Sequence, residues 1–268
     1  MSKSNIFVLS FVFFAAFAKA QQAPQPPVTY SSRSAFGIRN TDRLEQYLKI
    51  IDGVGSSATD ILSEQSLKSY MMPPRKSNTD KNSGEYALTA CFEYYVNLNS
   101  NYKDNLSPDY LSLNVISGNI EDDLSFLANT GTVSASVFPF YSPGITPGVN
   151  SSLKYKIKNF VQLFQTTTKA QQKIYDLRKA IMRGHPVTVE LRITQEFQKL
   201  QQTKFWNYRN GDKNFIGSKY LVAVGYDDER KAVELLNSSG REWGNGGYIW
   251  VSYDDFGELS INGYVLML

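Results

Sequence analysis

The chain contains one thiol and one imidazole, the two side-chain types that often combine as a nucleophile and its base. Cys91 is the only cysteine among 268 residues, and His185 is the only histidine. Composition leaves three roles open for Cys91: a small buried hydrophobic residue, an intermolecular disulfide partner or a reactive thiol. A metal site needs clustered His, Cys or carboxylate ligands, so we expect no metal and no other cofactor.

The first residues have the pattern of an export signal. Lys3 supplies a positive charge, an apolar run extends from Ile6 to Ala18, and Ala18-Lys19-Ala20 forms a small-x-small cleavage site. The run is shorter than the roughly 20 residues that a membrane-spanning helix requires. We therefore expect a signal peptide at residues 1–20, a secreted or periplasmic mature protein, and no stable membrane insertion after leader removal.

The charge of the chain excludes one class of partner. Loss of the leader lowers the net charge from +3 to +1, because two of the 28 basic residues and none of the 25 acidic residues are removed. No basic block or aromatic–basic stripe remains, so we expect no nucleic-acid partner. A hydrophobic content of 42% and a charged content of 20% are typical of a globular protein of one or two domains.

The spacing of apolar residues predicts the elements that position these side chains. Helices are expected before Gly53, within residues 89–99 with its start at Cys91, and over residues 119–131 and 169–183. Strands are expected at 186–193, 220–224, 232–236, 248–253 and 264–268. The acidic run Glu121-Asp122-Asp123 fits the first turn of a helix. Helices first and strands later indicate a segregated α+β architecture.

An ordered series of motifs carries a family resemblance. The C-terminal motifs are Gly217-Ser-Lys-Tyr-Leu-Val-Ala-Val-Gly-Tyr-Asp-Asp228, Asn237-Ser-Ser-Gly and Trp243-Gly-Asn-Gly-Gly-Tyr248. The upstream motifs are Leu106-Ser-Pro-Asp-Tyr-Leu111, Gly118-Asn-Ile-Glu-Asp-Asp-Leu-Ser-Phe-Leu, Phe138-Pro-Phe140 and Gly184-His-Pro-Val-Thr-Val. Their order and spacing resemble those of papain-like cysteine peptidases, over about residues 73–268.

The resemblance implies an α+β fold with a helical half, an antiparallel β-barrel-like half and a cleft between them. The papain-like domain is then residues 73–268, with about 73–165 in the helical half and 166–268 in the β half. Residues 21–72 are expected to form an N-terminal linker with a short helix, a possible prosegment remnant.

The resemblance also implies the roles of particular residues. In the family, the nucleophile begins the long central helix, and the base and an orienting Asn come from the second half. Cys91 matches the nucleophile position, Lys219 the position of the usual His, and Asn237 the orienting position. Glu85, six residues before Cys91 and expected in a loop, falls on the position of the Gln that binds the oxyanion. His185 falls on a structural position.

The Lys219 substitution is expected to abolish turnover. Lysine has an unperturbed pKa of about 10.4, which would have to fall by about three, or roughly 4 kcal/mol, for a base near neutral pH. A carboxylate at Glu85 would repel the developing oxyanion. Ser239 also replaces the Trp that shields the Asn–His contact in the family.

The sequence therefore predicts an exported papain-like peptidase homologue that is catalytically inactive and binds a peptide or protein ligand in its cleft. The alternative is an active thiol peptidase or amidase that uses Cys91 as nucleophile and Lys219 in place of His. A third possibility is a redox or covalent role for Cys91 that is unrelated to proteolysis.

Overall fold

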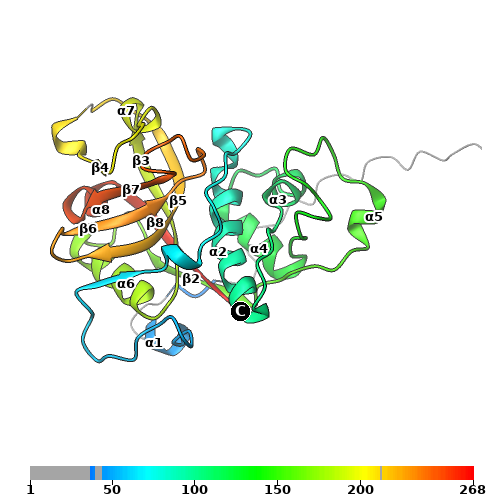
Figure 1. The fold of residues 1–268 in the computed structure, drawn as a ribbon, viewed down its shortest axis with the longest axis horizontal. Helices are drawn as coiled ribbons and strands as arrows, with labels where there is room; N and C mark the ends of the chain where they lie inside the picture. Colours follow the sequence, from blue (N-terminus) through cyan, green and yellow to red (C-terminus); the bar gives the residue numbers. More distant parts are fainter. Residues whose placement is uncertain (1–36, 40–43, 212) are drawn as a thin grey trace, which may run out of the picture.

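The computed structural model describes residues 37–39, 44–211 and 213–268, so the expected signal peptide lies outside the described residues. Figure 1 shows two halves, one built around the sheet and the other formed by α2, α3, α4 and α5. This arrangement confirms the expected α+β architecture, with a helical half beside a largely antiparallel sheet.

The helices of the described residues range from one turn to five turns. They are α1 (Leu44–Tyr47), α2 (Ser83–Ser100), α3 (Pro108–Asn114), α4 (Ile120–Asn129), α5 (Pro147–Asn150), α6 (Ala170–Met182), α7 (Gln195–Gln198) and α8 (Tyr253–Leu259). Short 3-10 turns lie at Lys68–Tyr70, Asp80–Asn82 and Tyr208–Asn210.

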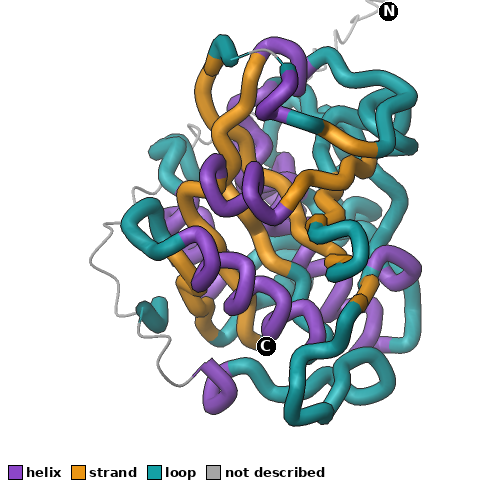
Figure 2. The backbone as a smooth tube through the Cα atoms, turned by 90° about the vertical axis from the view of Figure 1, so that its left-hand side faces the viewer, coloured by secondary structure: helices purple, strands orange, loops and turns teal. Residues whose placement is uncertain are grey.

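The strands described in the structure form one eight-stranded sheet. They are β1 (Glu64–Ser66), β2 (Asn159–Phe164), β3 (Val187–Thr194), β4 (Phe205–Trp206), β5 (Phe215–Asp227), β6 (Ala232–Leu236), β7 (Tyr248–Ser252) and β8 (Ser260–Met267). The order is β2-β8-β3-β5-β6-β7-β4, and β1 pairs with β5. Only the β4–β7 pair is parallel. The sheet curves, with helices lying around it (Figure 2).

Helix α2 corrects one prediction from the sequence. The expected start at Cys91 is wrong, because the helix begins eight residues earlier, at Ser83. Its first two turns are buried, with Tyr86, Ala87 and Leu88 in the core. This packing stabilises helix over a segment whose Ser-Gly-Glu start favours a loop. The last helical residue is Ser100. The C-cap residue, Asn101, has φ 49°, the left-handed conformation that Asn tolerates.

Other helices agree with the sequence pattern. The expected helix at 119–131 is α4, where the Oδ1 atom of Asn119 accepts from the backbone N–H of Glu121. The expected helix at 169–183 is α6. The Leu106–Leu111 motif contains the start of α3, which Ser107 caps by accepting from the N–H of Tyr110.

The five expected strands are present as β3, β5, β6, β7 and β8, and β5 is much longer than expected, with 13 residues. Strand β2 was assigned to the helical half, but it pairs antiparallel with β8. Its buried side chains, among them Phe160 and Val161, are almost continuous, a pattern that periodicity alone does not separate from a buried helix.

The N-terminal segment 44–71 is packed against the sheet half. Strand β1 pairs with the end of β5, and the N–H of Leu67 donates to the carbonyl of Val224 (2.7 Å). Leu44 and Leu48 are buried. The Nε atom of Arg183 donates to the carbonyl of Leu48 (2.6 Å). A domain boundary at residue 73 would therefore exclude one strand of the sheet.

Candidate functional site

The first turn of α2 lies against β5, where the two halves of the molecule meet. Ser83 begins the helix and is buried. Its Oγ accepts a hydrogen bond from the backbone N–H of Tyr220 (3.2 Å). The helix start therefore presents a hydroxyl. Ser83 was not predicted from the sequence as a site residue, although a polar Asn82-Ser83 pair before a long run without proline is a recognisable helix-start signal.

Cys91 lies in the third turn of α2. The side chain is 1% exposed, and its Sγ lies 3.3 Å from the Oγ1 of Thr188 on β3. Burial raises the pKa of the thiol to about 12, although the hydrogen bond to Thr188 opposes this. The favourable field of a helix N-terminus is confined to the first turn. Cys91 is therefore a protonated, enclosed thiol near neutral pH.

Lys219 is on β5, close to the loop that follows β6. The residue is 3% exposed, and its Nζ donates to the Oγ of Ser239 (3.0 Å). The strand register separates it from the thiol. Thr188, which contacts Cys91, pairs with Val222, three residues along β5 from Lys219. Three residues correspond to about 10 Å along a strand and, being an odd number, to the opposite face of the sheet.

Asn237 immediately follows β6. Its backbone N–H donates to the carbonyl of Gly247 (3.0 Å). Its side chain is buried, and among the described residues its Oδ1 has no hydrogen-bond partner. The backbone N–H of Asn237 is therefore satisfied, whereas its side-chain oxygen remains open to a water or a ligand.

Glu85 does not lie in a loop, which corrects a second prediction. It is in the first turn of α2 and is buried. Burial raises its pKa to about 7, and the charge of Asp109 adds to the shift. Burial, the charge of Glu85 and that of Asp122 raise the pKa of Asp123 well above its usual range. Counting six residues back from the helix start gives Ser77, whose N–H donates to the carbonyl of Ser238 (2.8 Å).

His185 has a structural environment, as expected. Its Nδ1 lies 2.8 Å from the hydroxyl of Tyr95, and its Nε2 lies 2.6 Å from the carbonyl of Lys49. Burial lowers its pKa to about 4. Both ring nitrogens are therefore used to hold α2 and the N-terminal segment 44–71 together.

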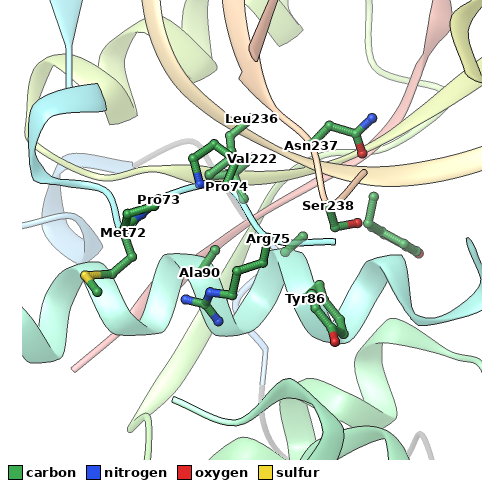
Figure 3. A pocket seen from close by; sticks show the side chains of 12 residues that line it. Met72, Pro73, Pro74, Arg75, Tyr86, Ala90, Val222, Leu236, Asn237 and Ser238 are labelled. Atoms are coloured by element: carbon green, nitrogen blue, oxygen red, sulfur yellow. The ribbon is translucent and has the colours of Figure 1, made fainter. Parts of the chain in front are cut away.

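A small cavity lies between α2, the middle of β5 and the end of β6 (Figure 3). Its volume is about 30 Å³. Its walls are largely apolar, and they include Met72, Pro73, Pro74, Ala87, Ala90, Val222 and Leu236. Two oxygens without described partners, Asn237 Oδ1 and Ser238 Oγ, lie at its edge. Figure 3 shows the amide oxygen of Asn237 on the side nearer α2. The cavity has room for one or two water molecules.

The described residues contain no group of three or more His, Cys, Asp or Glu side chains that could hold a metal ion. No helix in the same part of the chain combines the length and the apolar character needed to cross a membrane.

Several solved structures that share this fold are cysteine proteases. Procathepsin L 3 from the larval midgut of Tenebrio molitor has a TM-score of 0.64 at 18% identity, over 83% of this chain and 75% of that one. Xylellain from Xylella fastidiosa has a TM-score of 0.60 at 18% identity, and the match covers 82% of this chain and 94% of xylellain. Bromelain from Ananas comosus, solved with the E64 inhibitor, has a TM-score of 0.60 at 17% identity. The match covers 78% of this chain and 100% of bromelain. These similarities define the class of fold.

The family model of the papain family cysteine proteases matches residues 114–267, which is more than half of the chain. The chain therefore belongs to the papain family. No curated protein sequence matches it significantly.

Proposed function

We propose that this chain is an exported papain-family protein that has lost peptidase chemistry and holds a peptide or protein segment in its cleft. The observation that carries the proposal is the position of Cys91. A thiol nucleophile must be accessible and readily ionised. The only cysteine is instead buried in the third turn of α2, with a pKa raised to about 12 by that burial.

The residues at the start of α2 support the same conclusion. Ser83 presents a hydroxyl there, and its Oγ accepts from a backbone N–H. A serine nucleophile needs an adjacent general base. Lys219, at the family's histidine position, donates through its Nζ to Ser239. A general base has to accept the hydroxyl proton, whereas Lys219 is the donor in its hydrogen bond with Ser239.

The test of inactivity combines a thiol-directed irreversible peptidase probe with a broad peptide-substrate library, from pH 6 to 10. We expect no turnover, and no labelling of the native mature protein. Stoichiometric labelling in 8 M urea is the control that the thiol is intact. Cys91→Ala should leave the negative results unchanged, because the thiol is enclosed.

Three outcomes would contradict the proposal, and each identifies a different alternative. If Cys91→Ala abolishes turnover, the alternative of an active thiol peptidase with Lys219 as its base is supported. Turnover that Ser83→Ala abolishes, with Cys91→Ala unaffected, would indicate a serine nucleophile. Native labelling without turnover would support a redox or covalent role for Cys91.

Export is tested separately, by expressing the full chain in a bacterial host and sequencing the N-terminus of the exported protein. We expect the mature chain to begin at Gln21, because Ala18 and Ala20 form the small-x-small site. Ala20→Arg should block cleavage, and Ala15→Val, which lies in the apolar run, should not. Retention of an uncleaved wild-type chain in the cytoplasm would overturn the assignment.

A further inference from the structure

A second hollow shares one lining residue, Ser238, with the small cavity. Its volume is about 280 Å³. We call it the Lys76 groove, and its lining is Lys76, Ser77, Gln198, Lys199, Leu200, Gln201, Ser238, Ser239, Glu242 and Trp243. Leu200 and Trp243 are buried and form an apolar base. The indole N–H of Trp243 donates to the carbonyl of Phe197 (2.8 Å), which fixes the ring.

The Lys76 groove has more positive than negative charge. Lys76 and Lys199 are exposed, and within the described residues neither ammonium group has an ion-pair or hydrogen-bond partner. Glu242 is the only acidic residue in the lining. Lys219 is buried, and its Nζ donates to the Oγ of Ser239, which belongs to the lining.

The backbone positions one of these lysines. Residues 76 and 239 form an antiparallel bridge, so Lys76 is held at the edge of the loop after β6. Its aliphatic stem lies over Gly240, where an added Cβ would be 3.3 Å from the Cβ of Lys76. Ser238 presents a buried Oγ that has no partner in the described part of the chain. A hydroxyl donor and two ammonium groups therefore border one groove.

We infer that the Lys76 groove binds an acidic side chain, Asp or Glu, of the peptide held in the cleft. This inference rests on the proposed function and names the chemistry of the ligand. Carboxylates are acceptor-only groups that pair with ammonium and hydroxyl donors. The apolar base formed by Leu200 and Trp243 contacts the methylene groups of such a side chain. A groove with two unpaired lysines and one glutamate is too weakly basic for nucleic acid.

The test measures binding of fluorescent pentapeptide pools, acetylated and amidated at their ends, by anisotropy at 50 mM NaCl. One pool contains Asp and Glu, and its matched pool contains Asn and Gln at the same positions. We expect the acidic pool to bind about three- to tenfold more tightly, because exposed ion pairs contribute modestly. The preference should largely disappear at 500 mM NaCl, where charges are screened.

Variants locate the effect. Lys76→Gln combined with Lys199→Gln should remove the acidic preference, and Glu242→Gln should increase it by about two- to threefold, since it removes a repelling charge. Lys103→Gln combined with Lys158→Gln is the matched control, because both lysines are exposed and lie outside the groove. The Trp243 indole N–H resonance, assigned with Trp243→Phe, should shift when the acidic pool binds.

The outcomes separate this inference from the proposed function. Equal binding of both pools, unaffected by the double lysine variant, would overturn the inference and leave peptide binding intact. An Asn/Gln pool with free C-terminal carboxylates that binds as tightly as the amidated acidic pool would overturn the assignment to a side chain. Absence of binding by every pool at 1 mM would overturn both.

Discussion

Replacing Arg75 with methionine is expected to destabilise the folded protein by about 3–5 kcal/mol at pH 8. The Arg75 guanidinium forms an ion pair with Glu93, whose side chain is 0% exposed. Glu93 also accepts from the backbone N–H of Leu106 (2.6 Å). Removing one partner of a buried pair leaves an uncompensated charge, and a loss of this size is usual. Urea denaturation at pH 5 and pH 8 measures it.

The loss should depend on pH. Burial raises the pKa of Glu93 to about 7, although Arg75 and the Leu106 N–H oppose the shift. Because the folded-state pKa is raised, the stability that Glu93 contributes is present at low pH and is lost as pH rises through 7. Without Arg75 the folded-state pKa of Glu93 rises further, so this contribution to stability persists to a higher pH. The loss caused by Arg75→Met should therefore be larger at pH 8 than at pH 5, by up to about 1.4 kcal/mol for the one pH unit above 7.

Two further variants make this prediction decisive. Arg75→Met combined with Glu93→Gln should recover most of the lost stability, because both charges are then absent. Arg39→Met is the control, since Arg39 is 57% exposed and pairs with Glu121 (2.6 Å); exposed pairs contribute about 0–1 kcal/mol. A loss below 1 kcal/mol for Arg75→Met at pH 8 would show that the buried pair is not important for stability.

Glu85→Gln is expected to stabilise the protein at pH 8 by up to about 3 kcal/mol. Burial raises the pKa of Glu85 from 4.5 to about 7, and the Asp109 charge contributes. Each pKa unit corresponds to about 1.36 kcal/mol. The folded state therefore favours the protonated carboxyl, and wild-type stability falls as pH rises from 4.5 through 7. An amide removes this pH-dependent term and the repulsion that Glu85 exerts on Asp123.

The measurement is again the free energy of unfolding at pH 5 and pH 8. The difference between Glu85→Gln and wild type should be below about 1 kcal/mol at pH 5 and largest at pH 8. Glu229→Gln, at an exposed position in the β5–β6 turn, should show no such dependence. A Glu85→Gln difference that is the same at both pH values would exclude a strained, buried carboxylate at this position.

The sequence predicted the sheet half well, because its strands have clear apolar patterns and the motifs around Lys219 and Asn237 lie beside them. The start of α2 was wrong for a physical reason. The residues Ser83-Gly-Glu have low intrinsic helix propensity, and the burial that extends the helix comes from segments distant in the chain. The placement of Cys91 at a helix start, and of Glu85 in a loop, both depended on that boundary.

The environments of the site residues were not predictable from spacing. Lys219 on β5 contacts Ser239, and Cys91 on α2 contacts Thr188 on β3. The raised pKa values of Glu85 and Asp123 arise from two helices that bury acidic first turns near one another. In each of these three pairs the two residues lie far apart in the sequence.

The pairing of β1 with β5 constrains how this protein can mature. Zymogens of proteolytic enzymes are converted by cutting away an inhibitory N-terminal extension. Here a cut after residue 72 would strip away the strand at Glu64–Ser66 and expose the backbone of Tyr226 beside it. It would also uncover the apolar surface beneath Leu48 and Leu67. The segment is thus an integral part of the folded domain, and any proteolytic processing of the chain has to stop short of it.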